Sequence, residues 1–395
     1  MDEGSCLDVL VLAETYGLVQ LGQAAEEYIL AHFQSVSAGE KFKDVPCPLL
    51  ERLLEKDSLC VENSLSSPPP QALVLVGGDT VDDDFRKRVP SQTLWFAQQF
   101  HRGSGLIRSI EWKAFTKIPE LPRLRHCVCL LNNKLYVLGG RRYYGALDIL
   151  KSALPDMLCQ RDYFSAVSLD GKVFALGGNH DDRQYLDAVE YYSPEENTWR
   201  SHPLDTAVCG HAAAVLDGQI YISGGCDSHR RCLPSMWNYH PTHGCFPRSA
   251  MTAGAGRAGH VMLALGTGLV VAGGLQPLWM GFGDQLLCEL YDPTHDSWSP
   301  FPALPRPHVS PGATVLDGRL YVVGGFSANT AMDSKWVHCY DPKEERWEKL
   351  GAMPHPYTDL AACSLPKQIL NKLSKSGPTV HQVDINKIFL ECGFI

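Results

Sequence analysis

Two kinds of run are missing from the sequence: a long stretch of lysine and arginine, and an apolar stretch of membrane-spanning length. The net charge of the 395 residues is −9 at pH 7, which disfavours non-specific binding to nucleic acid or to anionic membranes. The longest apolar stretches, such as "GLVVAGGL" at 268–275, are far shorter than the roughly 20 residues that cross a bilayer. We therefore expect neither nucleic acid nor membrane among the partners.

Features of secreted proteins are also missing. The amino terminus "MDEGSCLDVLVLAE" begins with acidic residues and interrupts its apolar run with Asp8, unlike a secretory signal. The 14 cysteines mostly stand singly in helix-like or strand-like segments, which favours free thiols in a reducing compartment. A composition of 45% hydrophobic and 20% charged residues is typical of a folded domain. We expect a soluble, cytoplasmic protein.

What the sequence does contain is one phrase repeated along the chain, an alternating apolar segment that ends in two glycines. Glycine pairs close such phrases at 77–78, 139–140, 177–178, 224–225, 273–274 and 324–325. In "SLDGKVFALGG", "VLDGQIYISGG" and "VLDGRLYVVGG" an Asp-Gly dipeptide supplies the positive φ angles of a two-residue hairpin turn. Each phrase therefore predicts an antiparallel strand pair.

A second phrase follows four of the glycine pairs and places a tyrosine seven residues before a tryptophan or phenylalanine. The four aromatic pairs are Tyr192 and Trp199, Tyr239 and Phe246, Tyr291 and Trp298, and Tyr340 and Trp347. The proline-containing stretch between them predicts a turn joining two further strands, with the aromatic pair packed between neighbouring sheets. The glycine pairs at 177, 224, 273 and 324 lie 47, 49 and 51 residues apart, which is typical of four-stranded propeller blades.

Six glycine pairs predict six blades, of which the first two depart from the pattern. The first lacks a strand before its glycine pair, and we expect residues 357–365 to supply it and so close the ring. The second is short, because only 38 residues separate Gly139 from Gly177 and none of them form a Tyr-to-Trp phrase. Residues 79–112 are an insertion that we expect to be a surface loop.

The amino-terminal segment differs from the repeats. Residues 5–33 carry apolar residues at helical spacing with a break near Gly17, which predicts two short helices, and another helix is expected over 47–57. The segments "SCLDVLVLAETYGLVQLGQAAEEYILAHFQSV" and "LLERLLEKDSLCVEN" resemble the first half of a BACK domain. The glycine pairs with tyrosine and tryptophan resemble the kelch repeat. In this order, the two parts resemble the BTB-BACK-kelch (kelch-like) family, lacking the BTB domain and the second half of BACK.

The predicted fold class is an all-β, six-bladed kelch β-propeller with a small amino-terminal α-helical segment. The predicted domains are a truncated BACK-like module at 4–64, a Pro/Ser linker at 65–71, the propeller at 72–365 with a shortened second repeat, and a tail of unknown structure at 366–395. We expect the carboxyl-terminal strand to close the first blade.

The resemblance implies a function in protein recognition. Full-length members of the family are substrate adaptors of cullin-RING ubiquitin ligases, in which BTB binds the cullin and the propeller holds the substrate. For this chain we therefore predict a substrate-recognition module, with a cullin as the partner of full-length relatives and an unidentified substrate protein. The alternative is a non-ligase scaffold or competitor, for example a cytoskeletal binder.

One propeller face is the expected binding surface. Antiparallel pairing places the residues after each glycine pair on the same face as the residues that open each first strand, and the resemblance favours this face. Arginine, tyrosine and phenylalanine are common interface hot spots. The candidate substrate-binding residues are Arg125, Arg141, Tyr163, Asn179, Leu275, Phe326 and Tyr357. Four more arginines are expected nearby: Arg123, Arg142, Arg161 and Arg257. Together they predict a basic rim that prefers an acidic peptide; the alternative for each residue is ordinary loop surface.

Two groups of residues bear on metal binding and catalysis. The soft ligands in and near "CDSHRRC" are Cys209, Cys226, His229 and Cys232. Their spacing matches no familiar zinc finger, so we assign no metal. Three histidines lie thirteen residues before a glycine pair: His126, His211 and His260. A repeated position indicates a structural role rather than copper oxidase chemistry, and no catalytic constellation stands out, so we expect no enzyme and no cofactor.

Overall fold

The structure is a computed structural model that describes residues 5–32, 36, 41–42, 45, 71–81, 88–102, 108–117, 123–132, 134–142, 154–181 and 184–367. The chain divides into two compact units, Met1–Pro68 and Pro69–Ile395. None of the helices that these residues form has the length and apolar character needed to cross a membrane. The tail beyond residue 367 lies outside the described residues.

Most of the described residues of the amino-terminal unit form two helices, α1 (Cys6–Thr15) and α2 (Val19–Ala31). Gly17, between them, has φ +66°, a left-handed angle that glycine adopts at little cost, and this confirms the predicted break. Cys6, Leu10 and Ile29 belong to one buried apolar cluster shared by the two helices. The helix expected over 47–57 lies outside the described residues.

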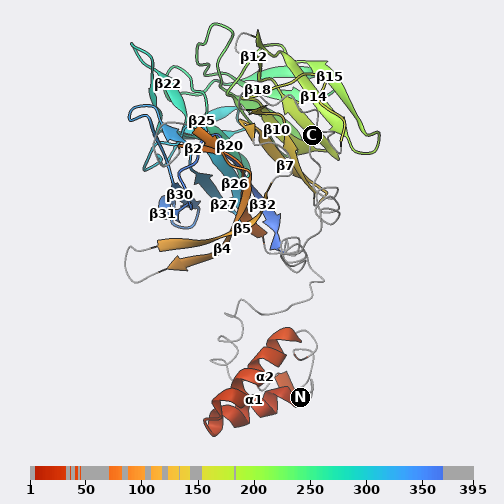
Figure 1. The fold of residues 1–395 in the computed structure, drawn as a ribbon, viewed down its shortest axis with the longest axis vertical. Coiled ribbons are helices and arrows are strands. Elements are labelled where there is room, and N and C mark those ends of the chain that lie inside the picture. The colour runs from red at the N-terminus through yellow and green to blue at the C-terminus, as the bar shows by residue number, and fades with distance from the viewer. Residues whose placement is uncertain are drawn as a thin grey trace. The chain divides into compact units, whose positions relative to one another are not determined.

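Five sheets of four antiparallel strands form the propeller blades in the described part of the chain (Figure 1). From the innermost strand outward, blade 1 is β32 (Ala361–Pro366), β1 (Gln71–Val76), β4 (Thr93–Arg102) and β5 (Arg108–Lys117). Blade 2 is β10 (Ser165–Leu169), β11 (Lys172–Leu176), β14 (Ala188–Ser193) and β15 (Thr198–Pro203). Blade 3 is β16 (Ala212–Leu216), β17 (Gln219–Ser223), β18 (Met236–His240) and β19 (Gly244–Arg248). Blade 4 is β20 (Val261–Leu265), β21 (Gly268–Ala272), β24 (Cys288–Asp292) and β25 (Ser297–Phe301), and blade 5 is β26 (Gly312–Leu316), β27 (Arg319–Val323), β30 (Trp336–Asp341) and β31 (Arg346–Ala352).

The prediction of six blades is wrong, because the described residues of the shortened repeat form no four-stranded sheet. They form an inner hairpin of β7 (Cys127–Leu131) and β8 (Lys134–Leu138), together with a short pair of β6 (Arg123–Leu124) and β9 (Arg141–Arg142). Leu135 and Val137 pack into the core of blade 1, whereas Tyr136 and Leu138 pack into that of blade 2. The inner hairpin thus fills the gap between these blades, and the innermost strands β32, β7, β10, β16, β20 and β26 contact one another in a closed ring.

The carboxyl-terminal strand completes the amino-terminal blade. β32 pairs antiparallel with β1 from Gln71–Pro366 to Val76–Ala361, and Figure 1 shows the blue β32 beside the orange strands of blade 1. The side chains of Cys363 and Leu365 are buried in the same apolar cluster as residues of β1. Backbone hydrogen bonds and apolar burial at this junction therefore hold the ring closed.

The prediction of a surface loop over 79–112 is also wrong. This segment forms β2 (Asp79–Val81), β3 (Arg88–Pro90), β4 and the beginning of β5, and the β4–β5 pair extends as a long hairpin in Figure 1. Its register shifts twice, between Leu94 and Trp95 and between Ala97 and Gln99, so its apolar alternation is irregular.

The glycine pairs recur because the following blade packs against them. Gly224 has φ +59°, and a Cβ there would lie 2.5 Å from the Arg257 carbonyl oxygen and 2.6 Å from Cε1 of His260. Gly225 donates its N–H to the same carbonyl oxygen at 2.8 Å. A Cβ on Gly77 would likewise lie 2.5 Å from Cε1 of His126. Only glycine leaves room for the repeated histidine, whose role here is to pack one blade onto the next.

The Tyr-to-Trp phrase forms a cross-strand pair on the two outer strands. Tyr192 lies opposite Trp199 with ring centroids 5.5 Å apart, and it also meets Tyr136 of the inner hairpin at 6.2 Å. The tryptophan Nε1–H groups donate to carbonyls of preceding segments: Trp199 to Pro155 at 2.9 Å, Trp298 to Ser249 at 2.7 Å, and Trp347 to Pro302 at 2.7 Å. Blade 3 departs from the prediction, because Tyr239 lies opposite Cys245, whereas Phe246 lies opposite Asn238 and is 47% exposed.

Candidate functional site

The glycine-pair face, meaning the propeller face that carries the glycine pairs, surrounds the mouth of a central cavity of about 260 Å³. The residues that precede the inner strands at this mouth all have left-handed φ angles between 48° and 63°: Arg125, Tyr163, Gly210, Gly259, Ser310 and Asp359. Backbone hydrogen bonds of 2.7–3.2 Å link five of these residues in series. In each bond the N–H of one residue donates to the carbonyl oxygen of the preceding one, in the order Tyr163, Gly210, Gly259, Ser310 and Asp359. These backbone groups are therefore occupied, and side chains decide the chemistry of the mouth.

Arg125 is at the centre of a charge cluster at this mouth. Its guanidinium lies 4.1 Å from the ring centroid of Tyr163, its Nε is 3.4 Å from Oδ2 of Asp359, and its Nη1 is 3.6 Å from Oδ2 of Asp162. Burial raises the pKa of Asp359 to about 6, although Arg125 opposes the shift. Because Arg125 is already compensated by two carboxyl groups, it does not supply a free positive charge for a ligand.

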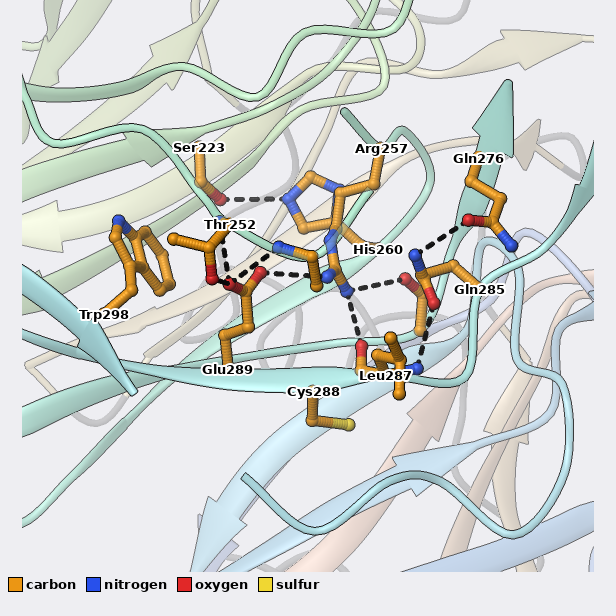
Figure 2. Close-up of polar contacts among 12 residues, drawn as sticks. Ser223, Thr252, Arg257, His260, Gln276, Gln285, Leu287, Cys288, Glu289 and Trp298 are labelled. Carbon is orange, nitrogen blue, oxygen red and sulfur yellow. Dashed lines mark hydrogen bonds and ion pairs between the residues drawn. The ribbon is translucent and has the colours of Figure 1, made fainter. Parts of the chain in front are cut away.

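Two members of the predicted basic rim do not lie on the face: Arg161 and Arg257 are buried inside the blades. The side chains of Arg123, Arg141 and Arg142 lie outside the described part of the structure, so their share of the rim stays a prediction. Arg161 pairs with Glu190, and both side chains are 0% exposed. In Figure 2, Arg257 reaches the carboxylate of Glu289, with Nη2 3.1 Å from Oε2, and donates to the Leu287 carbonyl at 2.8 Å. Glu190 and Glu289 supply the counter-charges with which these two guanidinium groups are buried.

These ion pairs follow a repeat that the sequence does contain. Arg161 and Arg257 each lie sixteen residues before a glycine pair, and Glu190 and Glu289 each lie two before the tyrosine of the aromatic phrase. In blade 5 the same two positions hold His308 and His338, whose Nε2 and Nδ1 are 2.8 Å apart. The recurrence of a complementary pair at fixed positions was the available signal that these arginines are structural.

The remaining predicted site residues are not brought together into one exposed surface. Leu275 and Phe326 begin two of its short hairpins, β22 (Leu275–Pro277) with β23 (Phe282–Asp284), and β28 (Phe326–Ser327) with β29 (Met332–Asp333). Asn179 begins a third, β12 (Asn179–Asp181) with β13 (Gln184–Tyr185), and its side chain is buried. Tyr357 is buried in the core between blades 1 and 5, so it offers no binding surface. Arg141 lies in β9, and its side chain is outside the described part of the structure.

The cysteine and histidine cluster does not converge on a metal site. Cys209 and Cys226 form a β-bridge, as do Cys226 and Cys232, but the His229 side chain is 75% exposed and its Nδ1 is 3.9 Å from Asp227. No group of three or more histidine, cysteine, aspartate or glutamate side chains is arranged to hold a metal ion within the described residues.

Sequence reasoning missed the most exposed apolar feature of this face, the tip of the β22–β23 hairpin. Trp279 is 99% exposed, Met280 is 85% exposed, and Leu278 and Phe282 are about half exposed. The base of the hairpin is held by Asp284, which accepts hydrogen bonds from Ser327 Oγ and the Ala328 N–H of the neighbouring hairpin, both at 2.6 Å. The available signal was the apolar run "LWM" between a proline and a glycine, where a turn would ordinarily be polar.

Comparisons with known proteins agree with this architecture. Residues 163–370 match the family model described as the KLHDC2/KLHL20/DRC7 Kelch-repeats domain, and residues 6–66 match the BACK model, described as BTB And C-terminal Kelch. The chain is 33% identical to human Kelch-like protein 33 over 319 aligned residues, which cover 60% of each chain. It is 28% identical to mouse Kelch-like protein 35 and 29% identical to rat Kelch-like protein 36, each over 58% of this chain. The alignments span 60% of the human protein and 38% and 40% of the other two.

Proposed function

This chain belongs to the kelch-like family, and on that premise we propose that its propeller holds a substrate protein for a cullin-RING ubiquitin ligase. The chain itself is proposed to be non-catalytic and to act in the cytoplasm. Its binding surface is the glycine-pair face, and the β22–β23 tip is the main anchor. The single observation that carries this proposal is the exposure of Trp279 and Met280 on that face.

A monomeric soluble protein rarely exposes such a group of large apolar side chains unless a partner covers them. Tryptophan is among the residues most enriched at binding hot spots, because it buries 150–250 Å² and loses few rotamers. The tip is also preorganised, since Asp284 fastens the hairpin to its neighbour and the Leu278 N–H donates to the Gly281 oxygen at 3.0 Å. A rigid anchor forfeits less entropy on binding.

The shape of the anchor indicates the kind of substrate. A side chain that projects fully into solvent needs a concave partner, so we propose that the substrate presents an apolar pocket on a folded domain. The mouth of the central cavity, where Arg125, Asp162 and Asp359 compensate one another, would then contribute polar contacts at the rim rather than the main affinity.

The test is an affinity purification of the chain from cells, comparing the wild type with Trp279→Ala. Loss of a tryptophan hot spot typically costs about 2 kcal/mol or more, or roughly 30-fold in affinity, so the substrate should disappear from the bound fraction. Phe246→Ala is the matched control, because this aromatic residue is 47% exposed on an outer strand rather than on the hairpin tip. Equal capture by both variants would refute the anchor.

The same purification separates the ligase role from its alternative. Cullin recovered together with a Trp279-dependent protein supports substrate selection for a ligase. A Trp279-dependent protein recovered without cullin, from cells in which a full-length kelch-like protein does capture cullin, supports a scaffold or competitor instead. A cytoskeletal protein in that fraction would identify the second role directly.

A further inference from the structure

We propose that Cys226 and Cys232 are a reversible oxidation site, at which the two thiols form a disulfide across the loop after the blade 3 glycine pair. This inference does not depend on the proposed substrate. It rests on the positions of the two side chains, the closed geometry of the loop between them and the contrast with the other described cysteines.

The two thiols are already in contact. Their sulfur atoms are 3.8 Å apart, and the two residues form an antiparallel β-bridge. Residues paired in this way have Cα atoms about 4.5–5.5 Å apart. A disulfide requires Cα atoms about 4.4–6.8 Å apart, so the backbone already satisfies the distance and only side-chain rotation is needed to bring the sulfurs together.

The loop between the thiols is held closed before any bond forms. The Asp227 carboxylate accepts the backbone N–H groups of His229 and Arg231 at 2.9 and 3.0 Å, and it also accepts Nε of the Arg231 side chain at 2.8 Å. In addition, the Asp227 N–H donates to the Arg231 carbonyl at 3.1 Å. Because these contacts already fix the ends of the loop, the disulfide would add little strain or loss of entropy to the folded state.

The pair also contains a thiol suited to react first. A hydrogen bond with the Cys226 thiol lowers the pKa of Cys232, so Cys232 is the better source of the thiolate that attacks an oxidant. Elsewhere burial has the opposite effect: it raises the pKa of Cys209 and of Cys288 to about 11 and that of Cys127 to about 12. These cysteines are therefore poor nucleophiles at neutral pH.

The reaction balances with a peroxide as the oxidant, which is small enough to reach a mostly buried sulfur. The Cys232 thiolate attacks one peroxide oxygen, the O–O bond breaks, and the departing hydroxide takes up the proton that Cys232 released, giving water and a sulfenic acid. The Cys226 sulfur then attacks the sulfenic sulfur, the S–O bond breaks, and the hydroxide leaves as water with the Cys226 proton. Two thiols are oxidised and one peroxide is reduced to two waters.

The position of the site gives the modification a consequence. The loop carries His229 and Arg231, whose side chains are 75% and 72% exposed on the glycine-pair face. A disulfide at its base would add a covalent link to the non-covalent contacts of Asp227 and of the Cys226–Cys232 bridge that hold the reduced loop. Any effect of this change on substrate affinity rests on the proposed function, but formation of the bond does not.

The experiment treats the purified full chain with hydrogen peroxide, blocks the remaining thiols by alkylation, and digests with trypsin and an aspartate-directed protease. Cleavage then separates 217–226, which contains only Cys226, from 232–248, which contains Cys232 and Cys245. We expect these two peptides to be joined and to separate on reduction. The disulfide that joins them should form roughly tenfold faster than Cys245 loses its reactivity toward alkylation.

Two variants make the assignment definite. Cys245→Ser should retain the joined peptides, because this partly exposed blade 3 thiol is not a member of the pair. Cys226→Ser should abolish them and leave a Cys232 sulfenic acid that a dimedone probe captures, with a melting curve to show that the variant is folded. Recovery of both Cys226 and Cys232 as separate alkylated thiols from oxidised wild type, or of Cys232 joined to Cys209, would overturn the proposal whatever the variants do.

Discussion

The buried ion pair of blade 4 makes a quantitative prediction about stability. Arg257 and Glu289 are 0% and 3% exposed, and the carboxylate accepts three more hydrogen bonds through Oε1, from the Thr252 N–H and hydroxyl and from the Ala253 N–H. Burial lowers the pKa of the Arg257 guanidinium, which shows that its charge is retained only at a desolvation cost that Glu289 offsets. Removing either partner leaves the other charge buried without its counterion.

We expect Arg257→Met to lower the free energy of unfolding by about 3–5 kcal/mol, the usual cost of breaking a buried pair. The variant loses the donors to Glu289, Leu287 and Gly273, and it leaves Oε2 of Glu289 uncompensated. Glu289→Gln should cost a similar amount, because it leaves the guanidinium unpaired. The melting temperature should fall on the order of 10 °C in each case.

The double variant Arg257→Met with Glu289→Gln tests the mechanism. It buries no charge, and the glutamine carbonyl oxygen still accepts the N–H groups of Thr252 and Ala253. We therefore expect it to be more stable than the sum of the single effects predicts, by about 2 kcal/mol. The control is Arg200→Met, which removes an exposed partner of Glu196 and should change stability by less than about 0.5 kcal/mol.

The assay is urea unfolding of the full chain followed by tryptophan fluorescence, since Trp298 belongs to β25 of the same blade and donates to the Ser249 carbonyl at 2.7 Å. Single variants that each cost less than about 1 kcal/mol would show that relaxation or water satisfies the stranded charge. Strictly additive costs in the double variant would show that the two side chains act independently. Either result would refute the argument that Arg257 and Glu289 stabilise the blade as a pair.

Two further predictions concern acid and the closing strand. Burial lowers the pKa of His211 and His308 to about 4 and that of His338 to about 3, so stability present above pH 6.5 should fall as the pH falls toward 4, because the unfolded chain binds these protons first. Burial raises the pKa of Asp359 to about 6, so this one carboxyl group binds its proton more readily in the folded chain and partly offsets the loss of stability. Melting temperatures that stay flat or rise from pH 7 to 5 would contradict the expectation. Truncation after residue 350 removes β32 and should abolish the cooperative melting of the propeller, whereas truncation after 375 retains β32 and should preserve it; a folded 350 truncation by circular dichroism would show that the ring closes without this strand.

The hairpins and the blade-to-blade packing were accessible from sequence because they depend on local backbone requirements. An Asp-Gly turn and a glycine pair at positive φ have few alternatives, so each repeat indicates its strand pair directly. The β4–β5 hairpin of blade 1 was missed because two register shifts disturb its alternation and no glycine pair ends it. The shortened repeat shows the converse limit: Gly139 and Gly140 are present, but a glycine pair specifies only the inner hairpin, and the outer strands need a phrase that this repeat lacks.

The candidate site was less accessible for a different reason. The mouth of the propeller is built from positions that repeat, and their backbone groups hydrogen-bond to one another in the series from Tyr163 to Asp359. What distinguishes one blade from the next must therefore come from side chains in the segments after the glycine pairs, which are the part of each repeat with no period. Arg125 stands at one of the repeated mouth positions and is neutralised by Asp162 and Asp359, whose contribution depends on spatial proximity across blades. Trp279 follows a glycine pair and meets the criterion, and its exposure follows from the fold, which presents the tip of β22–β23 to solvent with no element above it among the described residues. The periodic residues thus account for the scaffold, and the search for a partner begins with the residues that break the period.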